Sequence, residues 1–368
     1  MEKDNTIHYL ALQSVEGIGP VGARKLLKYF GSPEKIFSQK EKDLLKIKGL
    51  GPKLARKIKG GEVYRKAEAE LKRAIRAGVR IRVISDEDYP ENLKHCADAP
   101  LVLFCKGEFD LFDRRLISIV GTRKMTSYGN VFLSKFIREL KKYDPIIISG
   151  LAYGVDICAH RLALQNGLST IGILAHGMDR IYPRAHYQTA LAMAESGGLM
   201  TEFWMGTSPE KENFVKRNRI IAGLSEATLV VESSGKGGSL ITADLADSYH
   251  REVFAVPGKT TDQNSIGCNR LIKSNKALML TEAKDLEYML NWSPIPHRDD
   301  ESKIQEQEFS SEMERKVYNN IRIKGRKHVD QIALECECSI SVIFSVLLQL
   351  ELSGKVKSLS GHWYEVND

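Results

Sequence analysis

Three features of the sequence predict an α/β protein whose doubly wound parallel sheet lies between two small, mainly helical units. Residues 1–80 contain a repeated glycine-rich hairpin between helical segments. Residues 81–290 alternate short apolar runs with amphipathic segments, as strands and helices do in doubly wound folds. A polar, proline-containing linker, 291–310, precedes residues 311–368, where three helical segments are followed by a short β pair.

The first unit contains two copies of one hairpin, in which Gly17 recurs as Gly49, 32 positions later. Each copy reads Gly-apolar-Gly-Pro and then opens a helix with Ala-Arg-Lys. Proline at a helix's first position loses no hydrogen bond, and the glycines permit a sharp turn with exposed amides. This is the helix–hairpin–helix pattern of SAM-like domains, which serves either phosphate binding or plain packing. The candidate phosphate contacts are Gly17, Gly19, Arg24, Lys25, Gly49, Gly51, Arg56 and Lys57.

The strands predicted for the central part are short and apolar throughout. Such strands, separated by amphipathic helical segments, indicate a parallel sheet that helices cover on both faces. Ligands of an extended Rossmann-like sheet of this kind bind beyond the carboxyl ends of its strands. The predicted strands are 116–120, 146–149, 170–175, 199–203, 228–232, 253–256 and 277–280, and the predicted helices include 132–142, 157–165, 187–196 and 241–250.

The last unit has the pattern of a winged helix. Helices are expected at 312–323, 328–336 and 341–352, before two strands around Ser360-Gly361. Winged helices bind either duplex DNA or other proteins. The third helix, which stands where a recognition helix would, is nearly uncharged, and this weakens the reading of a DNA groove.

The composition is that of a globular protein with one basic end. The 368 residues carry a net charge of +7, and residues 1–80 hold nineteen Lys and Arg against nine Asp and Glu. This suggests a polyanion-binding module. No apolar run approaches the roughly 20 residues of a membrane span, and the first residues do not form a signal peptide, so we expect a cytoplasmic protein. The scattered cysteines are expected to be free thiols.

Three cations crowd into residues 216–219, next to an apolar run. Because unpaired charge is costly to bury, we interpret them as lining a mouth where an anionic ligand supplies the counter-charge; the solvated start of a helix is the alternative. Glycine-rich loops follow several predicted strands, and glycine lets the main chain approach an anion closely. Together these segments predict one pocket that holds several phosphate oxygens. The loops are 121–123, 149–156, 176–178 and 233–239, where Arg123 and Lys236 add fixed charge.

Several chemistries are disfavoured. The segment GTRKMTSYG after the first of these strands is not the dinucleotide fingerprint G-x-G-x-x-G, and Val253 stands where a Walker A motif ending at Thr260 needs glycine. We expect no cofactor, no metal and no catalytic residue. Asp156 is interpreted as a helix cap. The histidines interpreted as structural are His95, His160, His176 and His186.

The loops, taken in order, resemble the DNA-processing protein A family (DprA, also called Smf). The likeness spans about residues 85–285, and the two flanking units match the family's layout. Val215 departs from a common proline, and Lys236-Gly237 widens a loop; both bear on the shape of the pocket. The matching motifs are VGTR at 120–123, SG-x-A-x-GVD at 149–156, GMD-x-x-YP at 177–183, RNRIIAGLS at 217–225, GSLITA at 238–243, VPG at 256–258 and S-x-G-x-N-x-LI at 265–272.

The resemblance implies a homodimeric, non-catalytic adaptor for single-stranded DNA. Such a protein protects incoming DNA and loads the RecA recombinase onto strands coated by single-strand-binding protein during natural transformation. Asn218 is expected to meet a base edge or to orient a neighbouring side chain. The DNA contacts that the resemblance nominates are Gly121, Thr122, Arg123, Ser149, Gly150, Lys216, Arg217, Asn218, Arg219, Lys236, Gly238 and Ser239.

Two other functions stay open from the residues. A Rossmann-type nucleotide-processing enzyme, similar to a phosphoribohydrolase, would use Asp156 or Glu202 in N-glycosidic hydrolysis. Duplex binding through the first and last units would leave the central part as a dimerising scaffold. Leu271, Ile272, Leu278 and Met279 are candidates either for a subunit interface or for the core.

Overall fold

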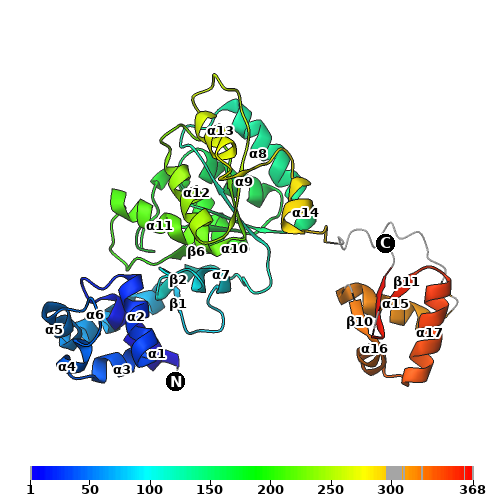
Figure 1. The fold of residues 1–368 in the computed structure, drawn as a ribbon, viewed down its shortest axis with the longest axis horizontal. Helices are drawn as coiled ribbons and strands as arrows, with labels where there is room; N and C mark the ends of the chain where they lie inside the picture. Colours follow the sequence, from blue (N-terminus) through cyan, green and yellow to red (C-terminus); the bar gives the residue numbers. More distant parts are fainter. Residues whose placement is uncertain (1, 296–308, 310, 325, 360, 367–368) are drawn as a thin grey trace. The chain divides into compact units, whose positions relative to one another are not determined.

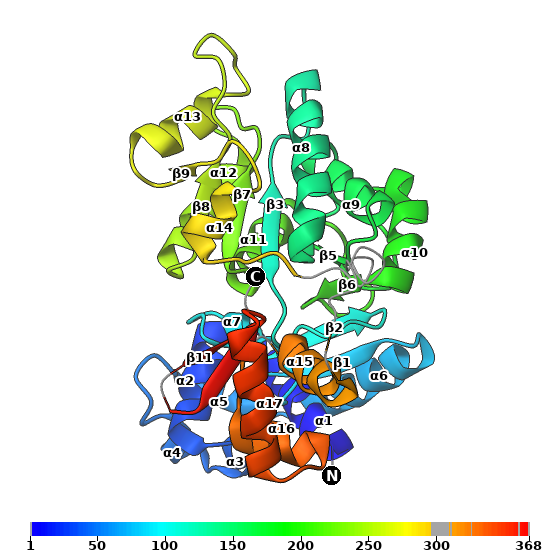
Figure 2. The ribbon, with the colours of Figure 1, turned by 90° about the vertical axis from the view of Figure 1, so that its right-hand side faces the viewer.

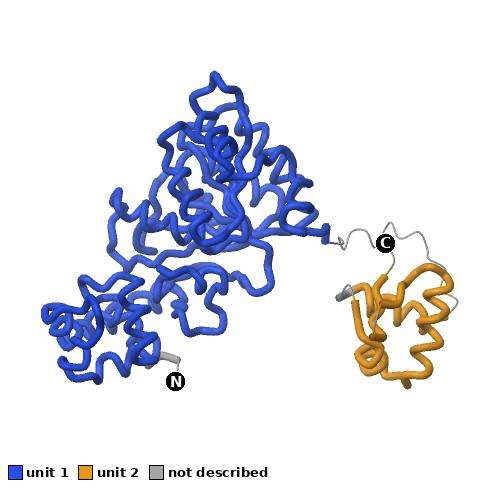
Figure 3. The backbone as a smooth tube through the Cα atoms, in the orientation of Figure 1, with its two compact units in different colours: residues 1–295 blue, residues 296–368 orange. Residues whose placement is uncertain are grey.

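A computed structural model describes residues 2–295, 309, 311–324, 326–359 and 361–366. The chain forms two compact units, residues 1–295 and 296–368 (Figure 3). The larger unit contains both the N-terminal head and the sheet, whose buried side chains share one core. The boundary expected at residue 80 therefore lies inside one compact unit and stays a prediction. Most of the linker expected at 291–310 falls outside the described residues.

Within the described residues, nine strands form one sheet in the order β1-β2-β6-β5-β4-β3-β7-β8-β9 (Figure 1). Neighbouring strands from β6 to β9 pair in parallel, which confirms the predicted doubly wound sheet. The antiparallel strands β1 and β2 were not predicted, and they extend the sheet toward the head. The bounds are β1 Arg80–Val83, β2 Val102–Lys106, β3 Leu116–Val120, β4 Ile146–Ser149, β5 Thr170–Ile173, β6 Gly198–Thr201, β7 Ala227–Val230, β8 Glu252–Ala255 and β9 Leu278–Met279.

Helices cover both faces of the sheet, and neighbouring residues of a strand belong to different cores. The ribbon in Figure 2 shows helices on both sides of the sheet. Ile117 and Ile119 of β3 pack in one core with α8 and α9, whereas Leu116 and Val120 pack in the other with α11 and α12. Burial on both faces explains why the strand sequences are apolar throughout. The helices are α7 Glu91–Lys94, α8 Ser127–Leu140, α9 Val155–Gln165, α10 Tyr187–Ser196, α11 Lys211–Leu224, α12 Gly238–Ser248, α13 Ile266–Lys273 and α14 Asp285–Leu290.

The head has the predicted tandem of hairpins. Gly17 and Gly49 adopt φ angles of 96° and 97°, so the two copies turn alike, and glycine is the residue that tolerates this conformation. Pro20 and Pro52 begin the helices that follow the hairpins. The helices are α1 Glu2–Gln13, α2 Pro20–Phe30, α3 Pro33–Ser38, α4 Glu41–Leu44, α5 Pro52–Lys59 and α6 Glu62–Arg76.

The second unit has the predicted winged-helix order, with a sheet arranged β10-β12-β11. Among the described helices, no single one is long and apolar enough to cross a membrane. Helices α16 and α17 reach such a length and composition only when taken together, and a bend of 110° separates them. The elements are α15 Glu312–Lys324, β10 Arg326–His328, α16 Val329–Cys336, α17 Ile340–Leu352, β11 Val356–Leu359 and β12 Trp363–Val366.

Candidate nucleic-acid interface

A pocket of about 530 Å³ lies at the carboxyl ends of β3, β4 and β7, where the doubly wound fold places its ligands. We call it the loop pocket. Loops from these three strands and one side of α11 enclose it. Its lining residues are Val120, Gly121, Thr122, Arg123, Ala152, Asp156, Lys211, Phe214, Val215, Arg217, Asn218, Ile221, Ser234, Gly237, Gly238, Ser239, Ile241 and Thr242.

Arg217 is a buried cation whose hydrogen bonds go to neutral acceptors. Its guanidinium donates to the carbonyl oxygens of Gly150 and Ile173, and its Nε donates to Asn218 Oδ1 at 3.2 Å. The side chain makes no ion pair with any described carboxylate, and the residue is only 4 % exposed. Burial lowers the pKa of Arg217 to about 10, although the charge of Asp156 opposes this shift. An anion in the loop pocket would therefore add to the counter-charge of Asp156, which forms no ion pair with Arg217 in the described structure.

Two glycines make room for this arrangement. A Cβ atom at Gly150 would lie 2.3 Å from Arg217 Nη1, so a larger residue would displace the guanidinium. Gly154 has a φ of 75°, and a Cβ atom there would lie 2.2 Å from the carbonyl oxygen of Thr122. The loop after β4 can therefore approach both Arg217 and the loop after β3 only because these positions lack side chains.

Arg123 adds exposed charge next to an aromatic ring. Its guanidinium carbon lies 5.4 Å from the ring centre of Phe214, and that of Arg217 lies 5.8 Å from the same centre. The ring of Tyr182 is 5.9 Å from Phe214. Cations and aromatic rings side by side match the phosphates and base faces of a single strand. Phe214 was not among the predicted contacts, although its position three residues before Arg217 on a helix signals a shared face.

The N-terminus of α12 forms another wall of the loop pocket. Gly237 caps this helix without a side chain, so the first amides are free to meet an anion. Gly238 and Ser239 line the pocket, as predicted, but the Ser239 hydroxyl donates to Ser233 Oγ at 2.9 Å. Lys236 is exposed in the same loop and does not line the pocket.

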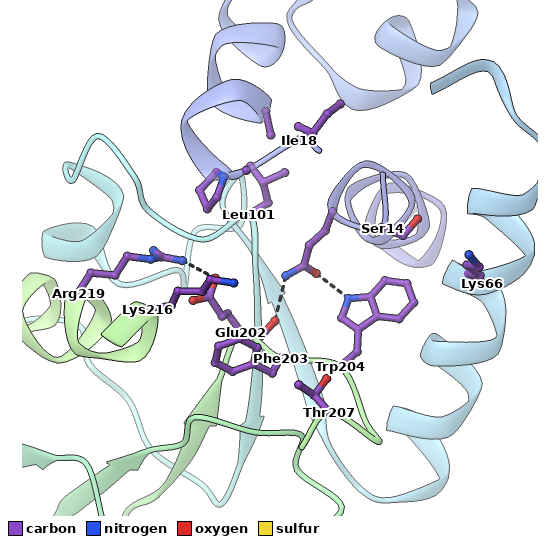
Figure 4. Close-up of a pocket in the computed structure, with 14 residues that line it drawn as sticks. Ser14, Ile18, Lys66, Leu101, Glu202, Phe203, Trp204, Thr207, Lys216 and Arg219 are labelled. Atoms are coloured by element: carbon purple, nitrogen blue, oxygen red, sulfur yellow. Dashed lines mark hydrogen bonds and ion pairs between the residues drawn. The ribbon is translucent and has the colours of Figure 1, made fainter. Parts of the chain in front are cut away.

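The basic run divides between two pockets, which corrects the prediction of a single mouth. Residues 216–219 lie in α11, and successive side chains of a helix point about 100° apart. Lys216 and Arg219 therefore face a second pocket of about 550 Å³ between the head and the sheet, which we call the head–sheet pocket (Figure 4). Its other lining residues are Gln13, Ser14, Ile18, Gly19, Pro20, Ala23, Lys66, Leu101, Glu202, Phe203, Trp204 and Thr207.

Arg219 has its counter-charge inside the protein. Its guanidinium pairs with Glu202 Oε2 and donates to the carbonyl oxygen of Asp98. Burial raises the pKa of the Glu202 carboxyl, and the charge of Arg219 opposes that rise. The prediction that a ligand neutralises this arginine was wrong, because the distant Glu202 does so at the end of β6.

The two carboxylates considered for an enzyme lie in different pockets. Asp156 lines the loop pocket and accepts a hydrogen bond from the amide of Ala152 at 3.4 Å, in the loop before α9. Burial raises the pKa of Asp156, and the charge of Arg217 opposes the rise. Glu202 lines the head–sheet pocket instead. The structure therefore does not bring these two candidates together at one reacting centre.

Comparison with known families decides the family of this chain. The model of DNA recombination-mediator protein A matches residues 80–291, which is more than half of the sequence. The chain belongs to this family. A SAM-like helix-hairpin-helix tandem matches residues 9–59, and a DprA winged helix domain matches residues 306–362. The predicted resemblance is thereby confirmed.

Relatives of the DNA recombination-mediator protein A family match most of the chain. Protein Smf from Synechocystis sp. is 33 % identical over 308 residues, which cover 83 % of this chain and 77 % of the relative. The X-ray structure of DNA processing protein A from Streptococcus pneumoniae has 31 % identity and a TM-score of 0.67, covering 78 % of this chain and 98 % of that one. A structure that addresses the single-stranded DNA binding mode of DNA processing protein A from Helicobacter pylori has 28 % identity and a TM-score of 0.53, covering 58 % and 98 %.

In this member of the family, the first hairpin of the head is docked on the rest of the unit. Arg24, predicted to bind phosphate, donates to the carbonyl oxygen of Lys94 at 2.9 Å and to that of Cys96. Lys25 donates to the carbonyl oxygen of Lys48. These contacts correct the prediction for Arg24, whose guanidinium holds the head in place.

The second hairpin has a freer surface. Gly49 and Gly51 are exposed, and so are the cations of α5. Arg56 Nε lies 3.5 Å from a carboxylate oxygen of Glu41, and Lys57 Nζ lies 2.7 Å from one of Glu16. Exposed ion pairs of this kind stabilise a protein little, so a phosphate can compete for these cations. Their role as phosphate contacts stays a prediction.

Ser149 serves the fold. It is fully buried, and its hydroxyl donates to the carbonyl oxygen of Ile119 at 2.6 Å, which links the ends of β3 and β4. Gly150 offers its carbonyl to Arg217. Neither residue lines the loop pocket, so the predicted direct contacts are better described as support for Arg217.

Proposed function

We propose that this chain is an adaptor that binds single-stranded DNA through its phosphates in the loop pocket. The observation that carries the proposal is Arg217, a buried cation bonded to neutral acceptors, beside the exposed Arg123 and the N-terminus of α12. Three sources of positive potential thus meet in one pocket, which the carboxylate of Asp156 also lines, and a phosphate is the ligand that matches the three. The similarity to the Helicobacter pylori protein, whose structure addresses single-stranded DNA binding, supports this assignment.

The wider role that we propose follows from the family. The adaptor acts in the cytoplasm without chemistry of its own, protects incoming strands during natural transformation, and loads RecA in the presence of single-strand-binding protein. Asn218 holds the Nε of Arg217, so its part in this role is to orient the cation.

The test reverses the charge of Arg123 and compares a matched neighbour. Arg123→Glu should weaken binding of a labelled oligonucleotide by tenfold or more whatever its sequence, and lower the salt slope by about 0.7 for each phosphate that the protein no longer neutralises. Lys124→Glu, which makes the same charge change at an exposed residue outside the pocket lining, should weaken binding less. Fluorescence anisotropy over a salt series measures both. Equal weakening in the two variants would refute the loop pocket as the site.

We also propose that two copies pair through β9. This strand is the last in the sheet order, and its residues Leu278 and Met279 are 43 % and 52 % exposed. An apolar edge strand is a template for pairing with another chain. Met279→Lys should yield a monomer in light scattering, whereas Leu45→Lys, at a comparably exposed leucine of the head, should leave the dimer intact. A dimer that survives Met279→Lys would rule out this interface.

A further inference from the structure

The head–sheet pocket contains a buried carboxylate oxygen without a donor. Glu202 Oε2 pairs with Arg219, but Oε1 has no hydrogen-bond partner among the described residues. The side chain is only 10 % exposed, and the residue lines the pocket. A buried acceptor left without a donor costs free energy. A ligand that carries an N–H group would therefore complete this site.

Aromatic rings stand beside this carboxylate. Trp204 Nε1 donates to Gln13 Oε1 at 2.9 Å, and Gln13 Nε2 donates to the carbonyl oxygen of Glu202 at 2.9 Å (Figure 4). The indole is thereby held in one orientation before any ligand arrives. Phe203 lines the same pocket, and both rings are only half-buried. Fixed, partly exposed rings are surfaces on which a planar heterocycle stacks.

Positive potential gathers at the same pocket. Lys216 is exposed and forms no ion pair with the described part of the chain. Helix α2 begins at Pro20, and its cap Gly19 has no side chain to satisfy the first amides. Gly19, Pro20 and Lys216 all line the pocket, so the helix N-terminus and the ammonium group of Lys216 favour an anion there.

We propose that the head–sheet pocket binds an amino-bearing nucleobase together with its phosphate. The base stacks on Trp204 and Phe203, its amino group donates to Glu202 Oε1, and the phosphate lies near Lys216 and the start of α2. A volume of about 550 Å³ is within the usual range of small-molecule sites. The nucleobase belongs either to a free nucleotide or to a strand held in the loop pocket, and the second source rests on the proposed function.

The experiment uses a full-length variant in which Trp204 is the only tryptophan. The sequence has three tryptophans, so Trp292→Phe and Trp363→Phe leave Trp204 as the sole tryptophan, which excitation at the red edge of the absorption band selects over the tyrosines. The titrants are dAMP, deoxyribose 5-phosphate and an adenine oligonucleotide. In parallel, anisotropy of a labelled oligonucleotide reports on the loop pocket. Lys216→Ala is the test variant, since its exposed side chain has no part in the core, and Arg123→Glu is the control in the other pocket.

We expect saturable quenching of Trp204 by dAMP. Binding of dAMP should be about tenfold weaker in Lys216→Ala and unchanged in Arg123→Glu. Deoxyribose 5-phosphate should bind the unaltered pocket about tenfold more weakly than dAMP does. Quenching by the oligonucleotide alone, shifted to higher concentration in both variants, would assign the base to a bound strand. If dAMP and the sugar phosphate bind equally well, the pocket takes only an anion and the proposal fails. If the labelled oligonucleotide binds while Trp204 responds to no titrant, the nucleobase site is refuted and the proposed function stands.

Discussion

Arg217 and Arg219 lie two residues apart on one helix and are 4 % and 9 % exposed, yet of the two only Arg219 forms an ion pair with a described carboxylate. Glu202 neutralises Arg219, so that arginine joins α11 to the end of β6. Arg217 bonds to carbonyl oxygens, which accept its hydrogens without cancelling its charge. Burial alone therefore does not show whether a cation stabilises the fold or binds a ligand. The charge of the groups to which it is hydrogen-bonded distinguishes the two roles.

The largest expected effect is on stability, at the paired arginine. Glu202→Leu should lower the free energy of unfolding by about 3–5 kcal/mol, because it leaves Arg219 buried and unpaired. Urea denaturation measures this decrease. The double variant Glu202→Leu with Arg219→Met should recover most of it, since no buried charge remains. A decrease in the double variant as large as that in the single one would show that the pair is not what stabilises this region.

The next effect is on DNA binding, at the unpaired arginine. Arg217→Gln keeps a polar side chain but removes the charge, and should weaken oligonucleotide binding by about 2–3 kcal/mol. Calorimetry at low salt measures the change. Because Gln can still donate to one carbonyl oxygen, circular dichroism should show a folded protein. Unchanged affinity in a folded Arg217→Gln variant would show that the charge of Arg217 does not contribute to DNA binding.

Burial, reinforced by the charge of Arg217, should also keep His160 neutral. Burial, with a smaller contribution from Arg217, lowers the pKa of His160 to about 3, and its Nδ1 lies 2.6 Å from Thr170 Oγ1. Between that pKa and the ordinary value of about 6.5, the unfolded chain binds more protons than the folded one, so stability falls as the pH falls. From pH 7 to pH 5 the group should account for about 2 kcal/mol. His160→Gln should remove that part of the pH dependence in urea titrations, and an unaltered dependence would contradict a neutral His160.

The smallest effect is expected at the exposed cation that faces the same pocket as Arg219. Lys216→Glu should weaken oligonucleotide binding only about threefold, since screened surface charges contribute little. Anisotropy in parallel with Arg123→Glu measures the ratio. If Lys216→Glu weakens binding as much as Arg123→Glu does, the two faces of α11 form one DNA site after all.

The strands and both flanking units could be predicted because their signals are local. Apolar runs such as 146–149 and the Gly-apolar-Gly-Pro turns determine their own conformation. Strand β1 escaped prediction because its sequence, RIRV, places charges where a buried strand has none; Arg82 is buried and pairs with Asp88 at 2.9 Å. The pattern in sequence does not reveal such a partner.

The site was harder to predict, because its geometry depends on contacts between distant segments. Arg24 and Arg56 hold the same place in two copies of one motif, yet one is bonded to backbone carbonyls and the other is exposed. Likewise, nothing near residue 219 in the sequence indicates that Glu202 will meet it. The cluster at 216–219 showed that charge would be concentrated on α11, but not which side chain would face which pocket.

Helix α11 is a partition with a pocket on either side. An occupant of one pocket that displaced this helix would alter the walls of the other. Thermodynamic reciprocity would then require that each occupant change the affinity of the other by the same factor. Occupation of the two pockets would in that case be coupled through α11 alone.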